Sequence, residues 1–158
     1  MKYAQQIANQ FRAVYLNGNW VSTNIKTQLS DVTWEQAKTK IGNLNTIADL
    51  AYHVNYYVAG IGKVLAGGPL DIRDKYSFDL PDINSEADWQ ALLSQMWEDA
   101  ERFADLVEEM PDEKLAQGFI DEKYGNYYRN IHAMIEHSYY HLGQLVILKK
   151  LILAQKPV

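Results

Sequence analysis

Apolar residues recur along much of the chain at the three- and four-residue spacing of amphipathic helices. The clearest stretch predicts a helix from Thr46 to Leu65. Thr46 and Asp49 form a capping-box pattern at its start, and Gly67-Gly68-Pro69 marks its end. The apolar face of this predicted helix consists of Ile47, Leu50, Ala51, Val54, Val58, Ile61 and Leu65.

The same periodicity predicts a helix near the start of the chain. Ile7, Phe11 and Val14 lie on one face of a stretch from about Tyr3 to Leu16, and Asn17-Gly18-Asn19 follows as a stop. We expect a short additional helix in the segment from Trp20 to Lys40, covering one end of the molecule.

Two longer helices are predicted in the second half of the chain. Ser85 with Asp88 resembles a helix start, and the apolar pattern that follows ends at Pro111. The last helix is expected from near Asn126 to about Leu153. At 1.5 Å per residue it would be about 40 Å long, enough to run the full height of a bundle.

These elements predict an all-α fold, a four-helix bundle formed as a single domain over residues 1–158. No β-type alternation is visible, and a chain of 158 residues with 47% hydrophobic content can build one core. The predicted connections before and after the third helix are long, about eighteen and about fifteen residues. Long connections allow neighbouring helices to be parallel, so a simple up-down-up-down order is not required.

Composition removes several classes of function. The chain has no cysteine, which excludes disulfides, thiolate metal sites and a cysteine nucleophile, so any thiol chemistry must use an external thiol. The first residues lack a signal-peptide pattern and no stretch has the length of a membrane span, which predicts a cytoplasmic protein. The net charge of −5, with no basic run beyond Lys149-Lys150, argues against nucleic acid and membranes as partners.

Candidate chemistry is concentrated in the histidines. His137 and His141 are four residues apart, so on a helix they project from one side, about 40° apart, and could both reach one metal ion at about 2.0–2.1 Å. Ser138 stands where a zinc protease has its glutamate, and no Glu-x-x-His sequence of the di-iron bundles occurs. The pattern therefore indicates a mononuclear, nitrogen-rich site that requires a third ligand.

His53 is the candidate for that third ligand, because it lies on the flank of the apolar face of its predicted helix. His132 is about 140° from His137 and about 180° from His141 around the helix, so we expect a surface or hydrogen-bonding residue rather than a ligand. The spacing alone is also compatible with two partly exposed imidazoles that bind no metal.

The segments Asn45–His53 and Glu136–Gln144 also carry a family pattern. The second contains His-x-x-x-His-x-Gly-Gln with a tyrosine before the second histidine, and it resembles the DinB-like superfamily of four-helix bundles. The resemblance implies an up-down-down-up helix order and one metal held by His53, His137 and His141. Similar members include thiol S-transferases and thiol-dependent isomerases, and a homodimer is an expectation of the family.

Three neutral histidines leave at least one position open on a zinc-like ion, which is typical of catalytic sites. The hypothesis is a metal-dependent enzyme in which water or an external low-molecular-weight thiol is activated to attack a small-molecule substrate, as in a thiol S-transferase or hydrolase. Zinc, nickel and iron all suit three histidines. The alternatives are a non-catalytic bundle whose site binds a ligand or stabilises the fold, and an interaction protein without metal.

Residues near the histidines have two interpretations each. Asp49 and Gln144 could orient an imidazole or bound water, or they are a helix-start carboxylate and an ordinary polar residue. Gly143 is interpreted as allowing close helix packing, because glycine inside a helix costs about 1 kcal/mol relative to alanine. Eight tyrosines could line a pocket or belong to the core: Tyr52, Tyr56, Tyr57, Tyr124, Tyr127, Tyr128, Tyr139 and Tyr140.

Overall fold

The computed structural model describes residues 2–18 and 20–155. The extreme ends of the predicted 1–158 domain, and Asn19 in the predicted stop of the first helix, lie outside the described residues. The described residues form seven α-helices and two 3-10 helices, and no β-strand occurs among them. The predicted all-α class is confirmed.

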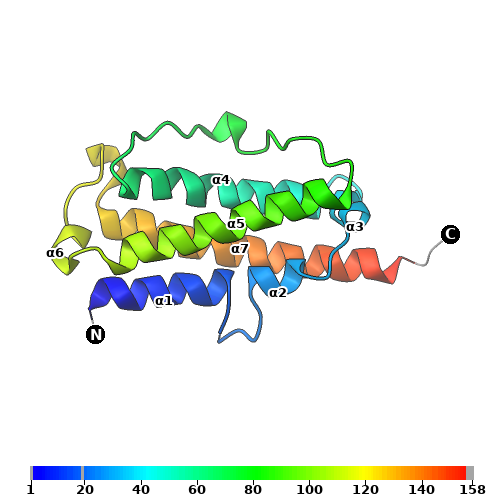
Figure 1. Cartoon of the computed structure of the whole chain (residues 1–158), viewed down its shortest axis with the longest axis horizontal. Coiled ribbons are helices and arrows are strands. Elements are labelled where there is room, and N and C mark those ends of the chain that lie inside the picture. Colours follow the sequence, from blue (N-terminus) through cyan, green and yellow to red (C-terminus); the bar gives the residue numbers. More distant parts are fainter. Residues whose placement is uncertain (1, 19, 156–158) are drawn as a thin grey trace.

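Four long helices make up most of the structure, and each corresponds to one predicted from periodicity. These helices are α1 (Tyr3–Tyr15), α4 (Ile47–Leu65), α5 (Glu86–Glu108) and α7 (Tyr127–Ala154). In Figure 1, α1 and α7 run in one direction and α4 and α5 run in the opposite direction. Both α1 and α4 pack against α5 and α7.

The long connections explain these directions. Residues 66–85, which include the 3-10 helix η1 (Asp74–Tyr76), return along the outside from the end of α4 to the opposite end of the molecule (Figure 1). This return lets α5 start beside the start of α4, so the two helices are parallel. Residues 109–126 carry α6 (Asp112–Leu115) and η2 (Glu122–Tyr124) and stay at one end, so α7 runs antiparallel to α5.

Local capping sets the helix starts as predicted. The Thr46 hydroxyl accepts from the Asp49 amide at 3.0 Å, and the Asp49 carboxylate accepts from the Thr46 amide at 2.8 Å, which completes a capping box. Ser85 and Asn126 cap α5 and α7 through their side-chain oxygens. After α4 the chain turns at Gly67, whose φ of 90° is a conformation that favours glycine.

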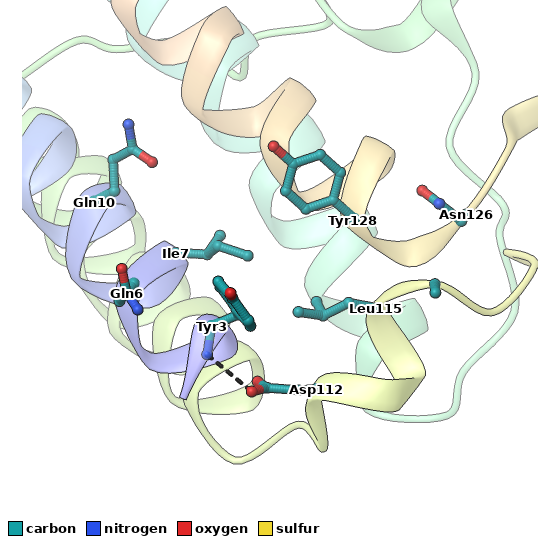
Figure 2. A pocket seen from close by; sticks show the side chains of 9 residues that line it. Tyr3, Gln6, Ile7, Gln10, Asp112, Leu115, Asn126 and Tyr128 are labelled. Atoms are coloured by element: carbon teal, nitrogen blue, oxygen red, sulfur yellow. Dashed lines mark hydrogen bonds between the residues drawn. The ribbon is translucent and has the colours of Figure 1, made fainter. Parts of the chain in front are cut away.

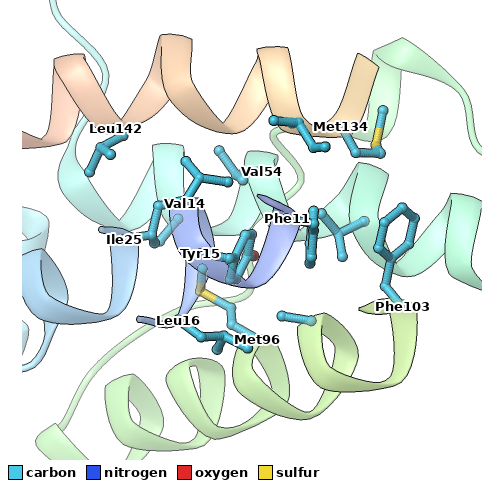
Figure 3. Packing of buried hydrophobic residues seen from close by; sticks show 14 of the residues in the cluster. Phe11, Val14, Tyr15, Leu16, Ile25, Val54, Met96, Phe103, Met134 and Leu142 are labelled. Carbon is cyan, nitrogen blue, oxygen red and sulfur yellow. The ribbon is translucent and has the colours of Figure 1, made fainter. Parts of the chain in front are cut away.

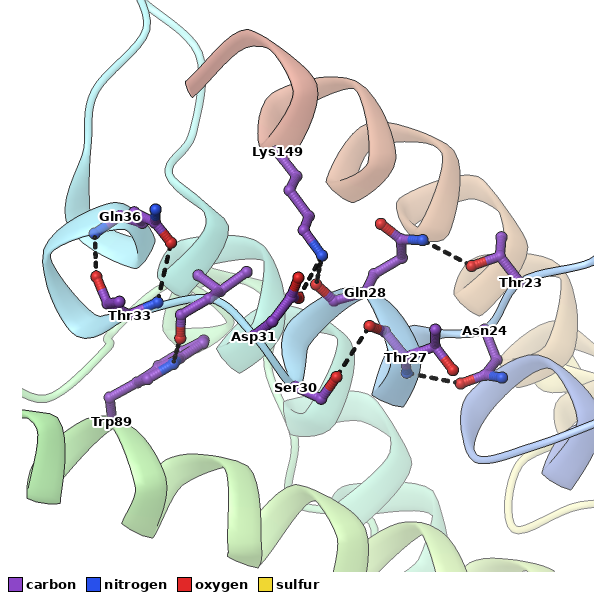
Figure 4. Close-up of polar contacts among 11 residues, drawn as sticks. Thr23, Asn24, Thr27, Gln28, Ser30, Asp31, Thr33, Gln36, Trp89 and Lys149 are labelled. Atoms are coloured by element: carbon purple, nitrogen blue, oxygen red, sulfur yellow. Dashed lines mark hydrogen bonds and ion pairs between the residues drawn. The ribbon is translucent and has the colours of Figure 1, made fainter. Parts of the chain in front are cut away.

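The segment from Trp20 to Lys40 holds two short helices rather than the single one expected, α2 (Ile25–Leu29) and α3 (Trp34–Lys38). Figure 4 shows how this segment is attached to α5 and α7. Lys149 donates to the Gln28 carbonyl at 2.9 Å and pairs with Asp31, and the Trp89 indole N–H donates to the Val32 carbonyl at 2.8 Å. Both helices therefore pack on the long helices instead of extending them.

The core lies between the four long helices (Figure 3). Phe11 and Phe103 are fully buried, with ring centroids 4.5 Å apart, and join α1 to α5. Among the described residues, no helix combines the length and the hydrophobicity needed to cross a membrane.

Gly143 does not have the role predicted for it. A Cβ built there would meet nothing within 4 Å, so Gly143 allows no close packing inside this chain. Gly62, by contrast, faces Phe103, whose nearest atom would lie 3.7 Å from a Cβ. The prediction failed because Gly143 lies on the outer face of α7.

Candidate metal centre

The three histidines singled out in the sequence converge in the structure. His53 projects from α4, and His137 and His141 project from α7, the helix packed against it. The Nε2 atom of His137 lies 3.2 Å from Nε2 of His53 and 2.9 Å from Nε2 of His141. The predicted convergence is confirmed, and metal binding itself stays a prediction.

These distances suit a single metal ion. Two nitrogen ligands about 2.0–2.1 Å from an ion are about 3.3 Å apart at the tetrahedral angle and about 2.9 Å apart at a right angle. The observed Nε2 separations of 3.2 and 2.9 Å match these two values. All three imidazoles could therefore ligate one ion with little movement of their side chains.

Hydrogen bonds on the far side of two rings orient them. Nδ1 of His53 lies 3.3 Å from the carbonyl oxygen of Ser77, and Nδ1 of His141 lies 2.7 Å from Oε1 of Gln144. A carbonyl oxygen only accepts, so each Nδ1 carries the hydrogen and each Nε2 presents a lone pair. This arrangement, with one ring nitrogen held by an oxygen acceptor, is common among metal-binding histidines.

The resulting cluster has more acceptors than donors. The lone pairs on Nε2 of His53 and His141 both face Nε2 of His137, which can offer at most one hydrogen. At least one lone pair therefore faces another nitrogen without a hydrogen between them. A divalent cation would interact favourably with all three lone pairs at once, so the donor chemistry fits a metal.

The protonation state of the three imidazoles also suits metal binding. Burial, helped by the charges of His141 and His53, lowers the pKa of His137 to about 4. Burial likewise lowers the pKa of His53 and of His141 below the ordinary histidine value. At neutral pH all three imidazoles are therefore neutral, which is the form that binds metals.

Aromatic rings surround the histidines. Phe78 stacks on His53 with ring centroids 4.1 Å apart, and Tyr57 meets His53 and His137 edge-on at 5.2 Å. Tyr140 meets His141 at 4.8 Å. Tyr57 and Tyr140 belong to the tyrosines predicted near the site. Phe78 and the Ser77 carbonyl were missed, because they lie in the connection 66–85, whose path no local pattern indicates.

His132 and Asp49, two other residues considered in the sequence, contribute to the fold and not to the candidate site. His132 points away from the site, as expected: it pairs with Glu136 at 3.3 Å and stacks on Tyr128. Asp49 serves the start of α4 and also lies 3.9 Å from Lys40, so it is a helix-start carboxylate. Gln144, in contrast, contacts a candidate ligand directly.

The site lies at the edge of the core, with His53 9% and His141 6% exposed. A separate cavity of about 620 Å³ lies between α1, α6 and the start of α7, and Figure 2 shows the side chains around it. No histidine lines that cavity. Within residues 2–18 and 20–155, His53, His137 and His141 are the group of side chains placed to hold a metal ion.

Comparison with known proteins adds no relative to this picture. No protein-family model, no curated protein and no solved structure matches the chain. The resemblance to the DinB-like superfamily stays a prediction, and the site is supported by its own geometry.

Proposed function

We propose that this chain is a metal-dependent enzyme of the DinB-like superfamily, built as an up-down-down-up four-helix bundle. His53, His137 and His141 would hold one divalent ion, zinc, nickel or iron. The observation that carries the proposal is the convergence of three Nε2 atoms from two helices, at separations of 3.2 and 2.9 Å.

The proposed reaction follows from the donor set. Three neutral imidazoles leave a position open on a zinc-like ion, and such an ion lowers the pKa of a bound water or thiol so that it can act as a nucleophile. The chain has no cysteine, so a thiol would have to be an external, low-molecular-weight one. The reaction class is thiol transfer to, or hydrolysis of, a small-molecule electrophile.

The surrounding residues support the ligands in this proposal. The Ser77 carbonyl and Gln144 hold the two imidazoles that they contact in the orientation that directs Nε2 to the ion. Phe78, Tyr57 and Tyr140 cover the outer sides of the rings with apolar surface, which reduces the access of water to the ligand nitrogens.

The second candidate function is a non-catalytic site that stabilises the fold or binds a ligand. The location of the histidines favours it, because an ion there would link α4 to α7 and, through His53 and Ser77, to the connection 66–85. The two functions differ in one physical property, since a structural site is closed and a catalytic site keeps an exchangeable position.

The first experiment is elemental mass spectrometry on tag-free protein purified without chelators. We expect near-stoichiometric divalent metal in the wild type, and its loss in His53→Ala and His137→Ala. His132→Ala is the matched control, because it removes a histidine from α7 outside the site, and it should keep its metal. Absence of metal from the wild type, even after reconstitution with several divalent ions, contradicts the proposal.

A second experiment separates catalysis from structure. Cobalt(II)-loaded protein is titrated with azide and with 2-mercaptoethanol while its visible absorption is recorded. If the metal has an open position, both probes should change the ligand-field bands. Assays of thiol transfer and hydrolysis would then follow. A spectrum that neither probe changes supports the closed, non-catalytic site.

A further inference from the structure

The cavity of about 620 Å³ between α1, α6 and the start of α7 has a lining suited to a ligand of its own (Figure 2). Its base is apolar, because Ile7 is 8% and Leu115 6% exposed. Two tyrosines at its sides stay accessible to solvent: Tyr3 on α1 is 71% exposed and Tyr128 on α7 is 46% exposed. We call this cavity the α1–α7 hollow. Its volume is in the range of small-molecule sites.

Contacts within the chain hold both tyrosines in place. The Asp112 carboxylate accepts from the Tyr3 amide at 3.0 Å and from the Ala4 amide at 2.9 Å, so α6 fixes the first turn of α1 (Figure 2). Tyr128 is supported from one side by His132, whose ring stacks on it with centroids 5.4 Å apart. The two aromatic rings are therefore positioned before a ligand arrives, which reduces the entropy lost on binding.

Side-chain amides supply most of the polar groups of the α1–α7 hollow. Gln6 and Gln10 line it from α1, and neither side chain forms a hydrogen bond within the part of the chain that the structure describes. Asn126 accepts from the Arg129 amide at 2.8 Å through its Oδ1, which leaves its NH₂ group as a donor. An amide offers a donor and an acceptor side by side, and this arrangement matches the polar edge of a nucleobase.

The charges around the α1–α7 hollow disfavour an anionic ligand. Among the described residues that line it there is no lysine or arginine, and Asp112 contributes a carboxylate. A phosphate group is held by basic side chains or by free amides at a helix start, and here Asp112 already occupies the first amides of α1. The charge of Lys2 acts on the same carboxylate and offsets it. The hollow therefore favours an uncharged ligand over a phosphorylated one.

We propose that the α1–α7 hollow binds an uncharged nucleobase or nucleoside. The base stacks against the rings of Tyr3 and Tyr128, since aromatic side chains stack with every kind of base. The amides of Gln6 and Gln10 form hydrogen bonds with its polar edge, and the apolar base of the hollow excludes water beneath it. This site goes beyond the proposed metal-dependent reaction and does not rest on it, because no candidate metal ligand lines the hollow.

Isothermal titration calorimetry of the full chain with adenosine, guanosine, cytidine and uridine tests the site. We expect saturable binding of at least one nucleoside, weakened about tenfold or more in Tyr3→Ala and in Tyr128→Ala. Tyr3→Ala keeps the backbone amide that bonds to Asp112, so the start of α1 should stay folded. Tyr76→Ala is the matched control, at a 43% exposed tyrosine outside the hollow, and should change the affinity less than about twofold. Binding of none of the four nucleosides, or equal weakening in all three variants, overturns the proposal.

Further variants test the polar edge and the independence from the metal. Gln6→Leu removes an amide at nearly the same size and should weaken nucleoside binding about 3- to 10-fold. Gln117→Leu makes the same change at an exposed glutamine outside the hollow and should have the wild-type affinity. His137→Ala should also bind the nucleoside as the wild type does, so loss of the metal and loss of this site are separate results. Far-UV circular dichroism checks that each variant is folded.

Two other ligands test the chemistry of the occupant. The 5′-monophosphate of the nucleoside that binds best should bind at least about threefold more weakly, because no basic side chain of the described lining meets its phosphate. Methyl α-glucoside, which is uncharged and not aromatic, should bind more weakly than the nucleoside. A monophosphate that binds as tightly as the nucleoside indicates a phosphate site, and a glucoside that binds as tightly indicates a carbohydrate site. Either result overturns the proposal.

Discussion

Two polar clusters, one around Asn55 and one around His53, lie at neighbouring positions of α4 but differ in how their donors and acceptors are paired. Asn55 accepts from the Tyr15 hydroxyl at 3.4 Å and donates to the Asp99 carboxylate at 2.9 Å, so donors and acceptors alternate across three helices. Two residues away, the Nε2 atom of His53 directs a lone pair at Nε2 of His137, and Nε2 of His141 does the same. In this cluster, hydrogen-bond acceptors therefore face one another. A buried polar group whose donors meet acceptors serves the fold, whereas converging lone pairs indicate a cation.

The largest expected effect is that of metal removal on the histidine cluster. With free metal at 100 to 1,000 times its dissociation constant, binding stabilises the folded state by about 3–4 kcal/mol. A chelator should therefore lower the melting temperature of the wild type and of His132→Ala, measured by circular dichroism. The chelator should leave the melting temperatures of His53→Ala and His137→Ala unchanged. An equal response of all four proteins would mean that the chelator acts elsewhere.

Breaking the hydrogen bonds of Asn55 should lower the stability of the fold without affecting the metal content. Asn55→Ala leaves the buried Tyr15 hydroxyl without its acceptor and removes a donor from Asp99, which should lower the free energy of unfolding by about 1–3 kcal/mol. Urea denaturation measures this loss, and elemental analysis should find the wild-type metal content. Gln95→Ala removes only an exposed hydrogen bond to Asp99 and should change stability by less than about 0.5 kcal/mol. Loss of metal in Asn55→Ala would show that the two clusters are not independent.

Changing Gln144 tests whether the orientation of an imidazole matters. Gln144→Ala removes the acceptor from Nδ1 of His141 and should weaken metal binding about 10- to 100-fold. Gln144→Glu keeps an oxygen acceptor and should retain most of the affinity. Competition with a chelator of known affinity gives both values. Equal affinities of wild type and Gln144→Ala would assign Gln144 no role in orienting His141.

The smallest expected effect is the pH dependence of the metal-free protein. The folded state holds His137 neutral because burial lowers its pKa to about 4, while the unfolded chain binds a proton near the ordinary value of 6.5. The unfolded state therefore binds more protons in this window, so stability falls as the pH decreases from 6.5 to 4 and is unaffected above it. Partial exposure of the ring to solvent reduces the size of the effect.

Chemical denaturation at several pH values, with chelator present, measures this slope. The free energy of unfolding of His137→Ala should depend less on pH than that of the wild type, and His132→Ala should have the wild-type slope. A slope that His137→Ala leaves unchanged would assign the acid sensitivity to other groups.

The elements that the sequence predicted well depend on short stretches of chain. The starts at Thr46, Ser85 and Asn126 were predictable because a cap involves residues no more than three positions apart. His137 and His141 were predictable as a pair because helix geometry alone puts residues four apart on one side. The contact of Gln144 with His141 has the same local origin, three residues along one helix.

The tertiary structure decided the features that join distant segments. It placed His53 opposite the α7 pair, and it brought Ser77 and Phe78 onto His53 from a connection whose path depends on which helices it must bridge. It also showed that Gly143 faces outward, which a helical period cannot reveal, because the same spacing fits a buried or an exposed face. The sequence by itself thus determined the helices and the candidate ligands, and long-range packing determined how the ligands meet.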